Sequence, residues 1–80
     1  MTRQDIIKKI APIFQEVFND DEMEVNMELS SEDIEEWSSL TQTILLTKIE
    51  EEFGIVFKLR EVAEMDNVES IVTMIESKQA

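Results

Sequence analysis

The sequence has no cysteine and no histidine, and both absences restrict the chemistry that its side chains can perform. Enzymes with a serine nucleophile normally place a base beside it, most often histidine. Only a serine–lysine pair would remain here, and nothing in the spacing supports one. We therefore expect that the chain is not an enzyme. A serine in it is better suited to being modified by another protein.

Glycine and proline are scarce too, with one residue of each. This leaves little room for a turn-rich β fold, whereas the abundance of Leu, Ile, Val, Met and Glu favours helices. The 80 residues should form one domain, residues 1–80. A domain of this size buries only about 60% of the surface of its unfolded chain, so modest stability is expected. No disulfide can add to it, which fits a reducing compartment.

Long apolar runs are missing as well. No stretch approaches the roughly 18–20 apolar residues of a membrane span. Lys8 and Lys9 follow the polar start of the chain, where a signal peptide would have its apolar core. We therefore expect a soluble, cytoplasmic protein.

Positive charge is in short supply, since 19 acidic residues against seven basic ones give a net charge of −12. The phosphate backbone of a nucleic acid would be repelled, whereas basic protein surfaces would be attracted and steered. An acidic surface also simply keeps a small domain soluble, so charge alone names no function. The expected state is a monomer.

The first helix is predicted from about Arg3 to Phe18, with Thr2 as its N-cap. Its apolar positions recur at helical spacing and share one face: Ile6, Ile10, Ile13, Phe14 and Val17. Pro12 conflicts with this helix, because an internal proline removes a backbone hydrogen bond and costs about 3 kcal/mol. One helix bent near residues 8–12 is preferred, and two shorter helices are the alternative.

A long connection follows over residues 19–38, and it is rich in acidic residues. A calcium loop of EF-hand type needs a glycine at its sixth position, and this stretch has none. Met23, Val25, Met27 and Leu29 alternate with polar residues, but a lone strand would have no partner. We expect an extended segment that lays these side chains onto the helices.

The second helix is predicted to begin at Ser38 or Ser39 and to end near Phe53, with Gly54 as the left-handed stop. Counting about 100° per residue separates two stripes along it. One stripe should face the core: Leu45, Leu46, Ile49 and Phe53. The nearly opposite stripe contains Leu40, Ile44, Thr47 and Glu51. Its two apolar residues indicate a contact surface, although small domains also leave some Leu and Ile exposed.

A short helix is predicted over residues 59–65, followed by a last helix that Asp66 or Asn67 caps. Glu69, three residues beyond Asp66, fits a capping box. The last helix should bury Val68, Ile71, Val72 and Ile75. The predicted fold class is therefore all-α, a small bundle of three principal helices plus a short fourth.

The run Trp37-Ser38-Ser39-Leu40 opens the second helix, and Glu50-Glu51-Glu52-Phe53-Gly54-Ile55 follows ten residues after Leu40. With this arrangement of helices, the chain resembles the acyl carrier protein family over essentially its whole length. That family includes the carrier domains of polyketide and nonribosomal peptide assembly lines. Its core signature, Asp-Ser-Leu, is short, but its distance to the second run makes the combination fairly specific.

The resemblance implies that Ser39 carries a 4′-phosphopantetheine arm, which would make the chain a phosphoprotein. A Mg²⁺-dependent phosphopantetheinyl transferase would direct the Ser39 hydroxyl at the pantetheine-side phosphate of coenzyme A. The arm's thiol would hold acyl or aminoacyl groups as thioesters, in fatty-acid, polyketide or related specialised biosynthesis. Ser38 is the competing acceptor, but Ser39 is the residue beside Leu40.

The chain departs from the family pattern at two places. Ser38 stands where the family usually has Asp; a serine can still cap the helix, but the lost carboxylate puts efficient modification in doubt. Thr41, Gln42, Thr43 and Ile44 are uncharged where carriers of fatty acid synthesis usually have acidic residues. The resemblance is therefore to a specialised carrier. Trp37 should either lie in the core or flank the arm.

The expected partners are the transferase and acyl- or aminoacyl-loading and condensing enzymes with basic surfaces. The residues expected to meet them are Leu40, Ile44, Glu35, Glu36, Glu51, Glu61 and Glu64. The alternative function is an acidic adaptor with the carrier fold that binds partners without an arm.

Overall fold

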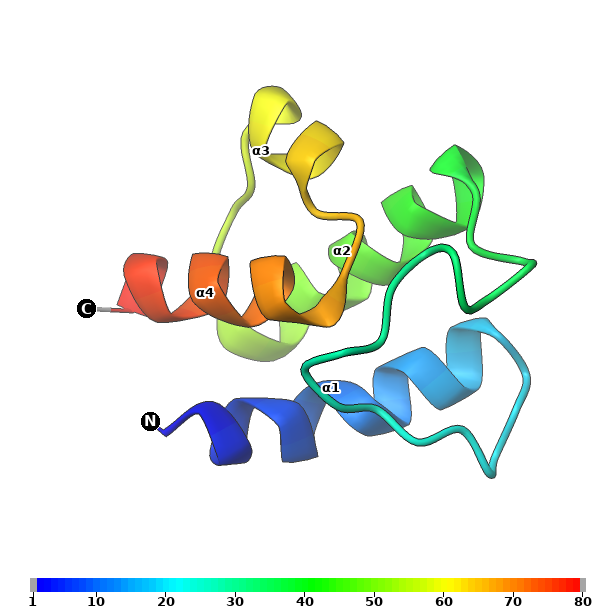
Figure 1. The fold of residues 1–80 in the computed structure, drawn as a ribbon. Helices are drawn as coiled ribbons and strands as arrows, with labels where there is room; N and C mark the ends of the chain where they lie inside the picture. The colour runs from blue at the N-terminus through cyan, green and yellow to red at the C-terminus, as the bar shows by residue number, and fades with distance from the viewer. Residues whose placement is uncertain (1, 80) are drawn as a thin grey trace.

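The computed structural model describes residues 2–79, which fold into four α-helices with no strand among them (Figure 1). The helices are α1 (Arg3–Val17), α2 (Ser39–Phe53), α3 (Leu59–Glu64) and α4 (Val68–Gln79). The predicted all-α bundle of three principal helices and a short one is confirmed. No helix within residues 2–79 has both the length and the apolar character needed to cross a bilayer.

Helix α1 begins with a reciprocal cap between Thr2 and Asp5. The Asp5 backbone N–H donates to the Thr2 hydroxyl at 3.1 Å, and the Thr2 N–H donates to the Asp5 carboxylate at 3.3 Å. The helix continues through Pro12, so the alternative of two shorter helices is wrong. Burial of its apolar face offsets the missing backbone bond, since Ile6, Ile10 and Phe14 are completely buried.

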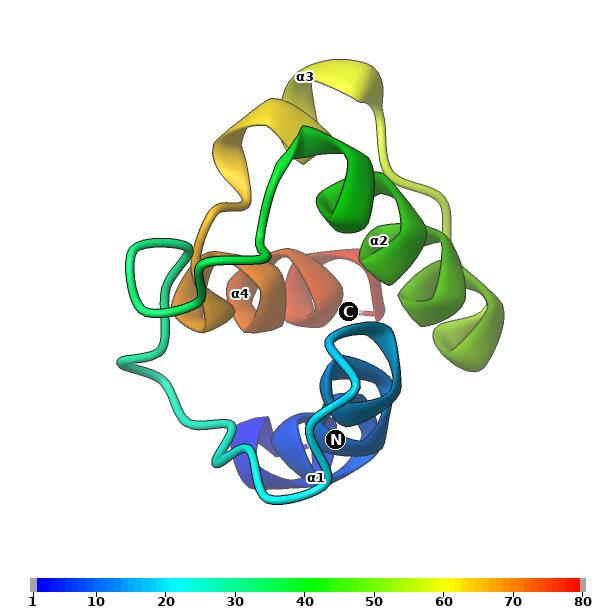
Figure 2. The same cartoon turned by 90° about the vertical axis from the view of Figure 1, so that its right-hand side faces the viewer.

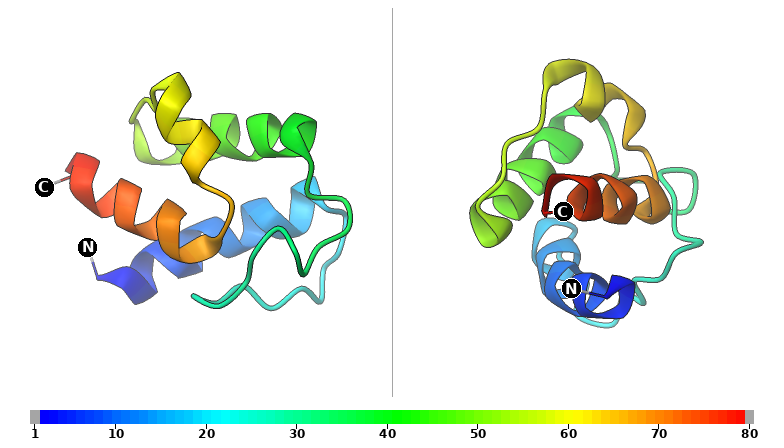
Figure 3. Two further views of the ribbon diagram at one scale, coloured as in Figure 1. Left: turned by 45° about the horizontal axis from the view of Figure 1, so that its top comes forward. Right: turned by 90° about the vertical axis from the view of Figure 1, so that its left-hand side faces the viewer.

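The helices are arranged around a single apolar core. Helices α2 and α4 lie in the middle, with α1 on one side of them and α3 on the other (Figure 2). The described ends of the chain lie at one end of the bundle, and α2 begins at the opposite end (Figure 3). The predicted inner stripe of α2 is confirmed, with three buried residues and Phe53 packed against the core. The four apolar residues predicted for α4 are buried as well.

The long connection between α1 and α2 is an extended segment held against the rest of the fold. The Ser31 N–H donates to the Asp66 carbonyl and the Val68 N–H donates to the Leu29 carbonyl, each at 2.9 Å. Its four alternating apolar side chains, from Met23 to Leu29, pack on the core. The predicted extended segment is confirmed, and it ties the loop before α2 to the junction of α3 and α4.

Residues at the ends of the helices supply the stop and cap conformations there. Gly54 ends α2 in the left-handed region, with φ 64° and ψ 39°. At the start of α4, the Ser70 N–H donates to the Asn67 side-chain oxygen at 2.7 Å. Asn67 is therefore the cap, and residues 2–79 show no reciprocal bond between Asp66 and Glu69. Helix α3 ends at Glu64, one residue earlier than predicted.

Replacing Gly54 with alanine should lower the free energy of unfolding by about 1 kcal/mol, because a Cβ disfavours positive φ. An added Cβ would meet no atom within 4 Å, so this cost is purely conformational. Urea unfolding of Gly54→Ala measures it, with Gly54→Asn as the milder control. An alanine variant as stable as the wild type would contradict the geometry of this turn.

Candidate functional site

Ser39 is the first residue of α2 and is exposed to solvent. Its carbonyl accepts a hydrogen bond from the Thr43 hydroxyl, one turn further along the helix, at 3.0 Å. Within residues 2–79, no group donates to or accepts from the Ser39 hydroxyl. The oxygen that the sequence singled out is therefore accessible and has no structural role of its own.

Ser38 differs from its neighbour because its polar groups cap α2. The Ser38 N–H donates to the Thr41 hydroxyl at 2.7 Å, and the Thr41 N–H donates to the Ser38 hydroxyl at 3.4 Å. The Thr41 hydroxyl also donates to the Glu36 carbonyl at 2.7 Å, which fixes the approach to the helix. The expectation that a serine at position 38 still caps the helix is confirmed.

Trp37 anchors the start of α2 to the core. Its ring lies 5.5 Å from the Phe14 ring in an edge-on arrangement and 5.8 Å from that of Phe18. Only 7% of Trp37 is exposed, which confirms a core position. Its indole N–H donates to the side-chain oxygen of Gln42 at 3.3 Å. The chain therefore turns from a buried Trp37 to an exposed Ser39 within two residues.

A hollow of about 480 Å³ lies beside the Ser39 side chain, between the start of α2 and α3. We call it the Ser39 hollow; it is lined by Ser31, Trp37, Ser38, Ser39, Gln42, Thr43, Leu59, Val62 and Ala63. A second hollow of about 300 Å³ continues further along α2, and Thr43, Leu59 and Val62 line both. Ser39 thus stands at one end of a groove whose α3 wall is apolar.

Four large apolar residues remain exposed on the described surface. Leu40 and Ile44 are exposed by 72% and 43%, as the outer stripe of α2 predicts. Val56 and Leu59, exposed by 76% and 88%, were missed by the sequence reasoning. The sequence carried no signal for Val56, because it lies between two other apolar residues, and only the structure shows that Ile55 and Phe57 turn inward. The sequence carried no signal for Leu59 either, because a helix of six residues has too few turns for its apolar and polar faces to be told apart.

The carboxylates expected at this surface have different surroundings. Glu35, Glu36, Glu51 and Glu64 are all exposed. Glu61 is not, because its carboxylate lies 2.9 Å from the Lys78 ammonium with both side chains only 20% exposed. The same carboxylate accepts the Lys58 backbone N–H at 2.7 Å. Glu61 therefore holds α3 to α4 and is less available to a partner than the other four.

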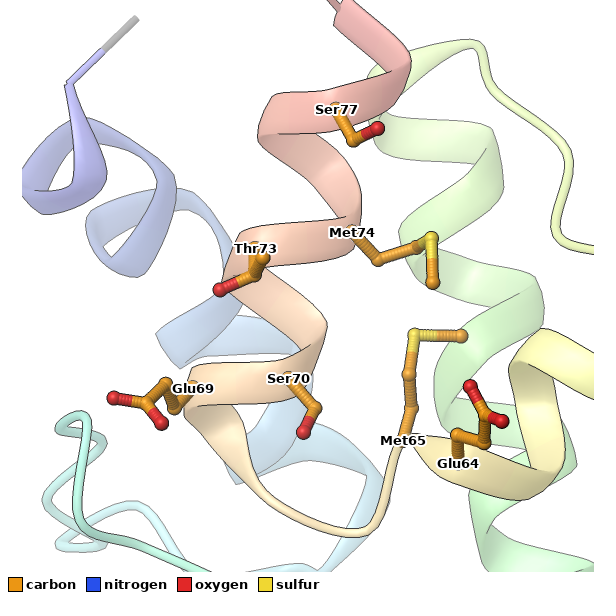
Figure 4. A pocket seen from close by; sticks show the side chains of 7 residues that line it. All are labelled: Glu64, Met65, Glu69, Ser70, Thr73, Met74 and Ser77. Atoms are coloured by element: carbon orange, nitrogen blue, oxygen red, sulfur yellow. The ribbon is translucent and has the colours of Figure 1, made fainter.

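A separate hollow of about 350 Å³ lies between the end of α3 and α4 (Figure 4). It shares no lining residue with the Ser39 hollow; its walls are Glu64, Met65, Glu69, Ser70, Thr73, Met74 and Ser77. Figure 4 shows Met65 and Met74 turned toward one another inside it. Its side chains offer apolar contact and scattered hydroxyls without a convergent reactive group, so the Ser39 hollow is the better candidate site.

No group of three or more carboxylates is positioned to hold a metal ion anywhere in residues 2–79. The acidic side chains of the long connection are instead used locally or face solvent. Asp20 accepts the Glu22 N–H at 3.1 Å, and Asp33 accepts the Ser30 N–H at 3.0 Å. These bonds close turns in the loop.

The pKa of Glu61 is lowered from its ordinary value, mainly by the Lys58 backbone N–H and next by Lys78. A carboxyl group with a lowered folded-state pKa stabilises the fold above its unfolded pKa, about 4.3, and this contribution disappears as the pH falls through the folded-state pKa. Glu61→Gln should therefore lower the urea midpoint at pH 7, and the difference from wild type should shrink below about pH 4.

Urea midpoints measured from pH 7 to pH 3 test this expectation. Glu64→Gln is the matched control, because it removes an exposed carboxylate from the same helix. A difference between Glu61→Gln and the wild type that stays constant over this range would show that the charge of the Glu61 carboxylate does not stabilise the fold.

Comparison with known structures finds a fold like this one in the solution NMR structure of a holo acyl carrier protein from Geobacter metallireducens. The two chains superpose with a TM-score of 0.83 and are 31% identical, over 92% of this chain and 85% of the other. No family model matches the sequence. A search of curated proteins finds no match either.

Proposed function

The chain belongs to the acyl carrier protein family, and on this basis we propose that it carries acyl or aminoacyl groups as thioesters on a 4′-phosphopantetheine arm attached to Ser39. The acyl or aminoacyl groups that it carries would be used in fatty-acid, polyketide or related specialised biosynthesis. A phosphopantetheinyl transferase joins the Ser39 oxygen to the pantetheine-side phosphorus of coenzyme A; the pyrophosphate P–O bond breaks, the hydroxyl proton is lost and adenosine 3′,5′-bisphosphate leaves. Separate enzymes load the arm and remove its cargo. The chain itself catalyses neither step.

One observation carries the proposal: of two adjacent serines, one hydroxyl is bound and the other is free. The Ser38 oxygen is held by Thr41 in the cap, whereas the Ser39 oxygen has no partner in residues 2–79 and faces solvent. A free, exposed hydroxyl is what another enzyme needs to reach. The preference for Ser39 over Ser38 therefore rests on hydrogen bonding as well as on the neighbouring Leu40.

The surroundings of Ser39 suit a phosphodiester. The first N–H groups of a helix lack intrahelical acceptors and lie at the positive end of its dipole, so they favour an anion there. Ser39 and Leu40 supply these groups at the start of α2. Beside them, the Ser39 hollow offers apolar walls from Leu59, Val62 and Ala63 to the arm's aliphatic part.

The arm, when attached, supplies the thiol that holds the cargo, and the protein supplies presentation. The cap at Ser38 and the buried Trp37 fix the point from which the arm extends. This division of labour agrees with the absence of histidine and cysteine from the sequence. Any general acid or base for the transfer has to come from a partner enzyme.

The partner surface that we propose is apolar at its centre and acidic at its edge. Leu40 and Ile44 supply the centre on α2, and Val56 and Leu59 extend it toward α3. Exposed carboxylates at Glu35, Glu36, Glu51 and Glu64 would meet basic groups of a loading or condensing enzyme. A carrier recognised by charge alone would not need an apolar centre in its partner surface. We therefore propose that this chain is a specialised carrier with different partners.

Incubation with coenzyme A, Mg²⁺ and a broad-specificity phosphopantetheinyl transferase should add one arm to the wild-type chain. Ser39→Ala should gain nothing, because it lacks the accepting oxygen. Intact-protein mass spectrometry measures the gain. Ser38→Asp, which restores the carboxylate usual in the family and can still cap α2, should be modified at least as fast as wild type. Wild-type protein that no transferase modifies would count against the proposal.

The four exposed apolar residues also favour a second candidate, an adaptor that binds partner proteins without an arm. Ile44→Glu should weaken binding in both cases, by about tenfold or more if the residue is central to the interface. Ser39→Ala should leave the binding of partner proteins at the wild-type level only if the chain is an adaptor without an arm. Binding assays with wild type, Ser39→Ala and Ile44→Glu separate the two, with Gln4→Glu on α1 as the charge-matched control.

A further inference from the structure

Gln42 lies one turn beyond Ser39 on α2, and its side chain joins three parts of the molecule. Its oxygen accepts the indole N–H of Trp37 at 3.3 Å. Its amide nitrogen donates to the backbone carbonyl of Val62 in α3. Both ends of the amide are therefore used, and each is matched to a partner of the required kind.

Apart from the packing of Val62 against the core, helix α3 has few other attachments at this end of the molecule. It has six residues, none of them buried, and Leu59 at its start is 88% exposed. Its salt bridge, from Glu61 to Lys78, ties it to the far end of α4. A single short helix is marginal in water without tertiary contacts, so each tie matters to its position. Within residues 2–79, the bond from Gln42 is the hydrogen bond that joins α3 to α2.

The bond also joins two residues that line the candidate site. Gln42 and Val62 both line the Ser39 hollow, together with Leu59 and Ala63. Residues three apart on a helix share a face, which places Gln42 beside Ser39. The separation of α2 and α3 at this bond therefore sets how wide the hollow is where the hydroxyl stands.

We propose that Gln42 is a positioning residue for transfer to Ser39: by bridging Trp37 and Val62 it holds α3 at the distance that gives an incoming enzyme one fixed surface around the serine. This inference rests on the proposed function. Gln42 touches neither the coenzyme nor the transferred group; it acts through α3. Loss of its bond to Val62 leaves the cap at Ser38 intact but frees α3 to move away from α2.

Gln42→Glu tests the inference, because it keeps the length of the side chain and the oxygen that accepts from Trp37. It replaces the N–H donor with a carboxylate oxygen that faces the Val62 carbonyl. Gln15→Glu is the matched control, since Gln15 makes the same kind of bond, to the Met23 carbonyl at 3.1 Å, away from the Ser39 hollow.

The first measurement is amide hydrogen exchange, followed by NMR, on the chain without an arm. In Gln42→Glu, the amides of residues 62–65 should exchange several-fold faster, while the buried amides of α1 and α4 keep their wild-type rates. The Trp37 indole N–H should remain hydrogen-bonded. Unchanged exchange in α3, or the same acceleration in Gln15→Glu, would overturn the inference whether or not Ser39 is ever modified.

The second measurement is the kinetics of arm transfer by the phosphopantetheinyl transferase. In Gln42→Glu, the KM for the carrier should rise several-fold, up to about tenfold for the loss of one hydrogen bond, while kcat changes little. A purely structural role would leave both constants unchanged once the chain is folded. Faster α3 exchange with an unaltered KM would overturn the positioning role, whereas failure to modify the wild type would overturn the proposed function itself.

Discussion

The reciprocal bonds between Ser38 and Thr41 are the interaction on which the rest of the site depends. They begin α2 one residue after Ser38, with the Ser38 hydroxyl 3.4 Å from the Thr41 N–H and the Thr41 hydroxyl 2.7 Å from the Ser38 N–H. Without this cap, the first N–H groups of α2 would lack side-chain partners, and the turn that holds Ser39 would fray. With the observed start, Leu45 and Ile49 are buried, while Ser39 and Leu40 face solvent.

The surface of the molecule combines a large negative charge with exposed apolar side chains, which the net charge alone does not predict. A chain with a net charge of −12 exposes four large apolar residues, of which Leu40 follows Ser39 directly and Leu59 lines the Ser39 hollow. Under the proposed function, the exposed apolar side chains would give a partner contact area, and the surrounding carboxylates would guide its approach without defining the centre of the contact. Helix α3 contributes to this surface while it remains lightly held. Two neighbouring residues make its polar contacts, since the Val62 carbonyl accepts from Gln42 and Glu61 pairs with Lys78, and the Val62 side chain packs against the core.

Local patterns predicted most of the fold. The spacing of Ile6, Ile10 and Phe14, the caps at Thr2 and Ser38, and the stop at Gly54 are all short-range signals, and the structure confirms them. Pro12 was the main local conflict, and the apolar face of α1 outweighed it. The limits of α3 were wrong by one residue because six residues are too few for a periodic signal.

The contacts that sequence reasoning missed join residues far apart in the chain. Gln42 reaches Val62, Glu61 reaches Lys78, and Ser31 reaches Asp66, and no periodicity relates the two members of each pair. Gln42 illustrates the difficulty, since in the sequence it was only an uncharged residue in the first turns of α2. Its role follows once Trp37 is buried and α3 lies alongside, both of which are properties of the packed molecule.

The most direct test of the account is the position of the added group within the chain after arm transfer. Fragmentation mass spectrometry of the modified peptide that contains residues 37–40 can distinguish the two adjacent serines. The account predicts that the whole of the added mass lies on Ser39, with Ser38 unmodified. Added mass on Ser38 would contradict it, because the capping oxygen would then be the reactive one.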